Sequence, residues 1–101
     1  MEPRIKRIVD RLKKYKPEKV ILFGSHARGS HDPYSDIDVV IIKKTRKFFL
    51  DRIKDVLKIA KPNFAIDILV YTPDEFEKMS SEGNAFLEYI IKEGKVIYEK
   101  S

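Results

Sequence analysis

The chain has no cysteine and no apolar run long enough to cross a membrane. Without cysteine there can be no disulfide, no thiolate zinc site and no thiol nucleophile, so oxygen-ligated metal is the inorganic chemistry to expect. The apolar stretch 37–42 is interrupted by Asp38, and the basic N-terminal residues lack the apolar core of a signal peptide. We therefore expect an intracellular, cytoplasmic protein that does not span a membrane.

What is present describes a folded domain. Hydrophobic residues make up 43% of the 101 residues and charged residues 37%, which is typical of globular chains and not of disordered ones. This length suits a single domain, 1–101, with a real core and no second folding unit. The net charge of +5 would suit nucleic acid, nucleotide phosphates or an acidic partner, and it does not choose among them.

The first segment reads as an amphipathic helix over residues 3–15. Ile5, Ile8, Val9 and Leu12 recur at helical spacing, and the opposite face carries lysine and arginine. That basic face is expected to be solvated, although its arginines also have the spacing to meet an acidic partner. They are Arg4, Arg7 and Arg11.

The remaining segments alternate between strand-like and helix-like patterns. Strands are expected at 19–23, 36–42, 64–71 and, as an edge strand, 95–99; helices are expected as a single turn at 25–29 and as longer pieces at about 45–60, 73–80 and 84–92; residues 31–35 form a polar loop. Phe49, Ile53, Val56, Leu57 and Ala60 share one stripe of the 45–60 helix. Thr72 and Glu75 have the spacing of a capping box. The order predicts an α/β (α+β) fold with a small mixed sheet of about four strands flanked by helices.

Three carboxylates fall on the strand-like segments. Asp36 and Asp38 are two residues apart, so on a strand they project from the same face at about 7 Å. Pairing with the 64–71 strand could add Asp67, which could otherwise be a solvated edge residue. Like charges this close repel unless cations lie between them, and two magnesium ions about 4 Å apart are the recurrent solution. We therefore predict a two-magnesium site held by Asp36, Asp38 and Asp67.

Residues suited to binding phosphate follow the first strand. Gly24 lets the backbone approach a ligand closely, and Ser25 offers a hydroxyl and an amide at a helix start. Arg28 could pair with phosphate or could hold one of the carboxylates. Tyr34 and Ser35 could touch a nucleotide, although turn residues at such a place need no such role.

The two histidines are not expected to bind metal. Magnesium prefers oxygen ligands, and neither His26 nor His31 has a cysteine or histidine companion at zinc spacing. We expect both to be solvated loop residues.

The spacing of these residues is specific. Glycine and serine followed, ten residues later, by Asp-x-Asp would arise by chance in about one chain in a thousand of this length. The chain resembles the DNA polymerase β-like nucleotidyltransferase superfamily, and Gly-Ser-x-Ala-Arg-Gly at 24–29 is similar to its minimal nucleotidyltransferase (MNT) branch. The resemblance is close over 20–38 and rests on Asp67 over 64–71; elsewhere it is one of pattern. It implies a polymerase β palm-like nucleotidyltransferase fold.

The resemblance also implies an activity, the transfer of AMP from magnesium-bound ATP to an acceptor hydroxyl with release of pyrophosphate. It implies that Gly24 and Ser25 hold the triphosphate, that Asp36 and Asp38 ligate both metals, and that Asp67 ligates the catalytic metal and helps to activate the acceptor. MNT proteins of this size are similar to antitoxins that silence HEPN ribonuclease toxins by adenylylating a toxin tyrosine. The expected function is thus that of a protein adenylyltransferase acting as an antitoxin.

Two other functions stay open on the sequence. The chain could neutralise its partner by stoichiometric contact alone, or it could transfer a nucleotide to a small molecule or an RNA end. The acceptor, the preferred base, the number of AMP units and the oligomeric state are not encoded in any motif that we recognise.

Overall fold

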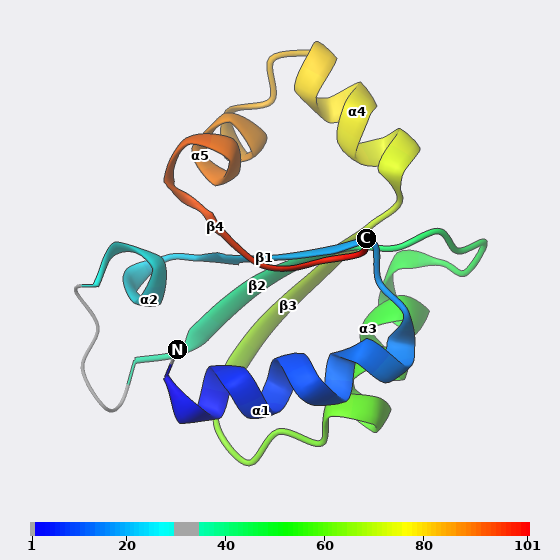
Figure 1. Ribbon diagram of the computed structural model, residues 1–101. Coiled ribbons are helices and arrows are strands. Elements are labelled where there is room, and N and C mark those ends of the chain that lie inside the picture. Colours follow the sequence, from blue (N-terminus) through cyan, green and yellow to red (C-terminus); the bar gives the residue numbers. More distant parts are fainter. Residues whose placement is uncertain (1, 30–34) are drawn as a thin grey trace.

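A four-stranded mixed sheet organises the protein in the computed structural model, which describes residues 2–29 and 35–101 (Figure 1). The strands are β1 (Lys19–Phe23), β2 (Ile37–Ile42), β3 (Ile66–Tyr71) and β4 (Lys95–Glu99), in the spatial order β3-β2-β1-β4. β1 is antiparallel to both β2 and β4, whereas β2 and β3 are parallel. The predicted mixed sheet and the edge position of 95–99 are confirmed.

Helices cover both faces of this sheet. They are α1 (Pro3–Leu12), continued by the 3₁₀ turn η1 (Lys13–Tyr15), then α2 (Ser25–Arg28), α3 (Phe49–Ala60), α4 (Pro73–Ser81) and α5 (Ala85–Glu93). α1 and α3 lie on one face, α4 and α5 lie on the other, and the short α2 stands at one end of the sheet (Figure 1). Within the described ranges, no helix has the length and apolar character needed to cross a membrane.

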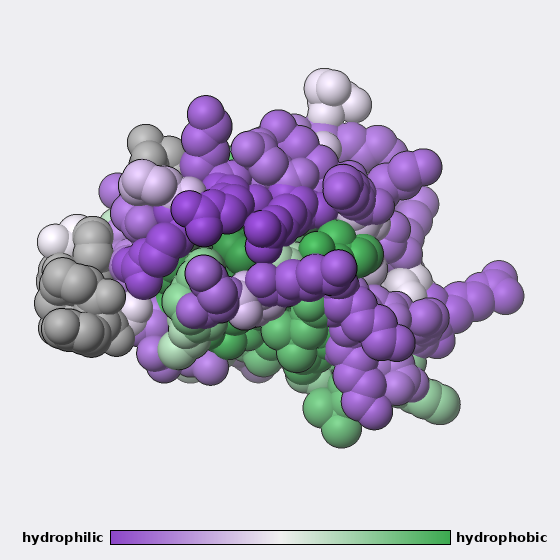
Figure 2. Space-filling view, turned by 90° about the horizontal axis from the view of Figure 1, so that it is seen from below, coloured by the Kyte–Doolittle hydropathy of each residue, from purple (hydrophilic) through white to green (hydrophobic). Residues whose placement is uncertain are grey.

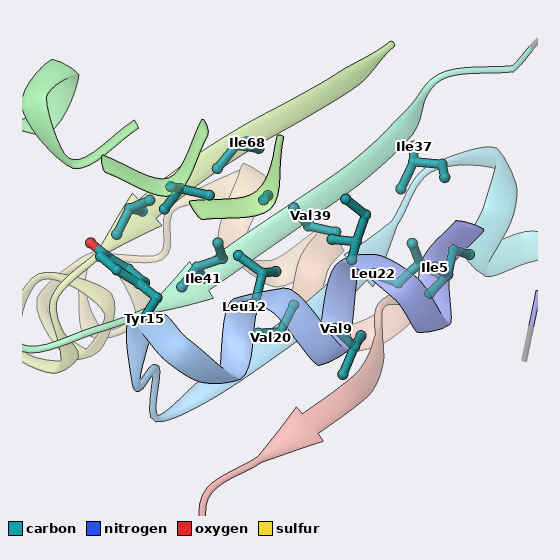
Figure 3. Packing of buried hydrophobic residues seen from close by; sticks show 14 of the residues in the cluster. Ile5, Val9, Leu12, Tyr15, Val20, Leu22, Ile37, Val39, Ile41 and Ile68 are labelled. Atoms are coloured by element: carbon teal, nitrogen blue, oxygen red, sulfur yellow. The ribbon is translucent and has the colours of Figure 1, made fainter. Parts of the chain in front are cut away.

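The alternation of side chains along β2 divides the core in two. Ile37, Val39 and Ile41 belong to the larger cluster, which packs against α1 (Figure 3). Val40 and Ile42 point the other way, into a second cluster with residues of α5. Because side chains alternate along a strand, Asp38 lies on the face of Val40 and Ile42, which is the face of the sheet that carries α4 and α5. Seen from the side of α1 and α3, the surface is mostly hydrophilic with apolar residues between the charged ones (Figure 2).

The third helix differs from its prediction at its start and on its buried face. It begins at Phe49 rather than near Thr45, because the Thr45 hydroxyl accepts the Lys47 N–H at 3.1 Å in a local turn. Leu57, predicted on the buried stripe, is 41% exposed. A buried Arg52 takes part in the inward face instead, so the stripe is rotated relative to the purely apolar pattern.

The capping box predicted from Thr72 and Glu75 is confirmed. The capping box of α4 is present, with Thr72 accepting the Glu75 N–H at 3.1 Å and Glu75 accepting the Thr72 N–H at 2.8 Å.

Two of the N-terminal arginines are engaged within the chain. Arg4 pairs with Glu2 at 3.2 Å, and Arg11 donates to the Ala60 carbonyl at 2.7 Å. These contacts explain both arginines without an acidic partner.

Candidate active site

Asp38 and Asp67 lie side by side on neighbouring strands. The parallel register of β2 and β3 places one directly opposite the other, so the strand pairing on which Asp67 depended is confirmed. Their carboxyl groups lie close enough for Asp67 to raise the pKa of Asp38. Two strands that are otherwise apolar thus present one acid each at the same level of the sheet.

Asp36 does not join this pair in a three-carboxylate group. It is exposed and immediately precedes β2, where the alternation of the strand does not yet fix its side chain. Among residues 2–29 and 35–101, no three His, Asp or Glu side chains converge closely enough to hold a metal ion. The predicted convergence is therefore met by two acids, with Asp36 near enough for its charge to act on Asp38.

The negative charges around Asp38 outweigh the positive charge of Arg28 in their effect on its pKa. Burial, the hydrogen bond to Asp67, and the charges of Asp67 and Asp36 raise the pKa of Asp38 from its ordinary 3.8 to about 6, while Arg28 acts in the opposite direction. A divalent cation would relieve this repulsion, and carboxylate oxygens are the ligands that magnesium prefers. The donor set of Asp38 and Asp67 therefore fits magnesium, with Asp36 at its edge.

Gly24 brings the backbone against this carboxylate pair. Its φ of 74° and ψ of −155° lie in a region that is essentially restricted to glycine. A Cβ atom at this position would overlap the Asp38 carboxylate. Ser25 begins α2 directly after Gly24, so both residues predicted to cradle phosphate lie at the end of β1 beside Asp38.

Arg28 contacts a residue that the sequence analysis missed. Its Nη1 donates a hydrogen bond to the Tyr89 hydroxyl of α5 at 2.8 Å, across a separation of 61 residues in sequence. It is also close enough to Asp38 for its charge to lower the pKa of that carboxyl. No local spacing signal could have identified Tyr89.

An aromatic cluster stands next to the acids on the same face. Phe23 is the register partner of Asp38 across β1 and β2. Its ring packs edge-on against Phe86, with centroids 5.6 Å apart, and against Tyr89 at 6.4 Å. Aromatic side chains of α5 therefore flank the candidate site on this face.

The prediction that His26 is a solvated loop residue is wrong. His26 is 6% exposed, and its Nε2 lies 3.2 Å from the backbone oxygen of Ser35. The turn of α2 directs it inward, where it links α2 to the segment entering β2. Ser35 is thus placed next to α2, whereas the predictions for His31 and Tyr34 lie outside the described residues.

The chain is similar in sequence to a known protein family and to two proteins of one archaeon. The sequence model of the family "Polymerase beta, Nucleotidyltransferase" matches residues 6–101. The "Putative protein adenylyltransferase MJ0604" of Methanocaldococcus jannaschii is 34% identical over 101 residues, covering 96% of this chain and 97% of that protein. The similarly named MJ0141 of the same organism is 35% identical over 65 residues, which cover 64% of this chain and 66% of that protein.

A solved structure shares the fold. It is described as a toxin-antitoxin crystal structure with AMP-PNP, and it aligns with a TM-score of 0.62 and 16% identity over 95% of this chain and 73% of that one. At this identity, the likeness shows the arrangement of helices and strands.

Proposed function

The chain belongs to the polymerase beta nucleotidyltransferase family, and from this premise we propose that it transfers AMP from magnesium-bound ATP to a hydroxyl of a partner protein. The observation that carries the proposal is the pairing of Asp38 with Asp67 beside the Gly24 backbone. The name of the relatives, protein adenylyltransferase, supports a protein acceptor. The fold neighbour described as a toxin-antitoxin structure supports a toxin as the partner. We take the acceptor to be a tyrosine of a HEPN-type toxin, which makes this chain the antitoxin.

In the proposed reaction, the acceptor oxygen forms a bond to the α-phosphorus of ATP while the bond from that phosphorus to the β-phosphate oxygen breaks. Pyrophosphate leaves, and the hydroxyl proton passes to a carboxylate oxygen of Asp67. Asp38 and Asp67, with Asp36, would hold magnesium, which when bound neutralises phosphate charge and lowers the pKa of the acceptor hydroxyl. Gly24 and Ser25 admit the triphosphate against the backbone at the end of β1.

Transfer can be measured with ATP labelled at the α-phosphate, magnesium, and the protein encoded next to this chain. We expect the label to appear on the partner protein, and ATP labelled at the γ-phosphate to leave the partner unlabelled. Label found in a small-molecule or RNA fraction, with none on protein, would contradict the protein acceptor and favour the other nucleotidyl transfers. Absence of label in every fraction would contradict the catalytic proposal.

Magnesium should stabilise the protein more at neutral than at acidic pH. Because the pKa of Asp38 is raised in the folded state, its contribution to stability is full below 3.8 and is lost as the pH rises through about 6. Magnesium binds the deprotonated acids, so its binding adds stability in the pH range where the contribution of Asp38 has been lost. At ten times its dissociation constant, magnesium should add about 1.4 kcal/mol, or about 6–11 °C in Tm, near pH 7.5 and less than half of that near pH 5.

Thermal unfolding with and without magnesium at the two pH values measures this difference. Asp38→Asn should abolish most of the gain, whereas Asp10→Asn, which alters an exposed acid of α1, should retain it. An equal gain at both pH values, or an undiminished gain in Asp38→Asn, would show that magnesium stabilises the protein elsewhere.

A further inference from the structure

The Tyr89 hydroxyl is held in a fixed place at the edge of the candidate active site. The ring is half-buried on α5 and packs at 89° against Phe23, with the centroids 6.4 Å apart. Phe86, one turn earlier on α5, also packs edge-on against Phe23, with the ring centroids 5.6 Å apart. Since Phe23 is the register partner of Asp38, the Tyr89 ring is anchored to the residue directly opposite the acid.

Arg28, by contrast, is a long exposed side chain on the last residue of a four-residue helix. The next residue, Gly29, has a φ of 74°, so the helix ends there. A side chain in that setting loses much rotamer freedom when it is immobilised on a ligand. Its hydrogen bond to the Tyr89 hydroxyl, at 2.8 Å, restricts that freedom before any ligand arrives.

This contact leaves most of the guanidinium available. A guanidinium has five N–H donors, and the bond to Tyr89 uses one nitrogen, Nη1. The hydrogen bond holds the guanidinium against Tyr89, whose ring packs on Phe23, the register partner of Asp38. Planar N–H pairs of this kind bind phosphate oxygens in a bidentate manner.

We propose that Tyr89 is a positioning residue, which holds the Arg28 guanidinium beside Asp38 in the orientation that binds the triphosphate of ATP. The proposal rests on the proposed nucleotidyl transfer and assigns a task to α5, a helix outside the Gly-Ser and Asp-x-Asp motif. It predicts that the loss of one hydroxyl on α5 weakens nucleotide binding through Arg28 alone.

Tyr89→Phe tests this role because it removes the hydroxyl and keeps the ring against Phe23. The probe is magnesium with α,β-methylene ATP, whose link between the α- and β-phosphates cannot be cleaved by transfer. We expect the affinity for this probe to fall about fivefold. In the transfer assay, KM for ATP should rise by a similar factor while kcat stays within about twofold, a division that a general loss of structure would not produce.

A double-mutant cycle with Arg28→Gln shows whether the effect passes through the arginine. In the Arg28→Gln background, adding Tyr89→Phe should change the affinity by less than about 1.5-fold. Tyr98→Phe is the matched control, because Tyr98 lies on β4 and packs against the core cluster of the opposite face; it should bind the probe as the wild type does.

Wild-type affinity in Tyr89→Phe, or effects of the two substitutions that multiply, would overturn the role of Tyr89. Failure of the wild type to bind the probe would overturn both this role and the proposed function. Coupling without transfer to any acceptor would count against nucleotidyl transfer and leave the role of Tyr89 standing, whereas transfer without coupling would do the reverse.

Discussion

Replacing both Asp36 and Asp38 with asparagine is expected to reduce AMP transfer by at least about a thousandfold. The neutral amides keep the size of the carboxylates but cannot balance the charge of a bound cation. The protein should remain folded, because burial and the neighbouring acids, which raise the pKa of Asp38, make its charged form costly, and asparagine removes that charge. The initial rate of label transfer, together with the Tm in the absence of magnesium, separates the two effects.

Asp10→Asn serves as the control for this pair, since Asp10 is an exposed acid on α1, on the opposite face of the sheet from Asp38. It should transfer AMP at the wild-type rate. A double variant that keeps more than a tenth of the wild-type rate would contradict the role of these acids. If the double variant lost transfer yet still protected cells from a toxic partner at equal expression, neutralisation would depend on contact and not on adenylylation.

The carboxylate pair was predictable because each of its strands carries a local signal. β2 and β3 are short apolar runs that hold one acid each, Asp38 and Asp67, and a parallel pairing that buries the other face brings the acids level. Gly24 was predictable because a strand end followed by a helical turn favours glycine. The local structure of each segment follows from its own residues, whereas the level position of the two acids depends on the pairing of β2 with β3.

The residues that were missed depend on contacts between distant segments. Tyr89 reaches Arg28 across 61 residues, and no periodicity within α5 marks it. His26 is buried because α2 turns it toward the segment before β2, which a loop pattern does not encode. Arg52 was passed over because a cation on a helix normally faces solvent. Its burial is defined by partners contributed by three other segments.

Arg52 is the buried cation that ties α3 to the start of α4. It is 6% exposed, and its Nε donates to the Lys47 carbonyl at 2.8 Å while Nη1 donates to the Val70 carbonyl at 3.1 Å. Its guanidinium also pairs with both carboxylate oxygens of Glu75, at 2.7 and 3.2 Å. Glu75 in turn completes the capping box of α4. One side chain therefore satisfies acceptors from a loop, a strand and a helix.

Arg52→Met should destabilise the protein by about 2–4 kcal/mol and lower Tm by about 10–20 °C at neutral pH. Methionine fills similar space but donates no hydrogen bond, so the buried Val70 carbonyl, the part-buried Lys47 carbonyl and the Glu75 carboxylate lose their partner. Arg52→Lys should lose less stability than Arg52→Met, because an ammonium group can replace part, though not all, of these hydrogen bonds. Lys54→Met, on the exposed side of α3, should stay within about 0.5 kcal/mol of the wild type.

The pH dependence distinguishes the ion pair from simple packing. The hydrogen bond from Arg52, above all other contacts, holds the pKa of Glu75 below its ordinary 4.5. The contribution of Glu75 is therefore present above pH 4.5 and is lost as the pH falls through the lower folded value. Denaturant unfolding of the wild type should show this loss at acidic pH, and Arg52→Met should show a flatter profile over the same range. If the two profiles were parallel, the destabilisation would come from packing and the pairing with Glu75 would contribute little, as expected for an exposed carboxylate.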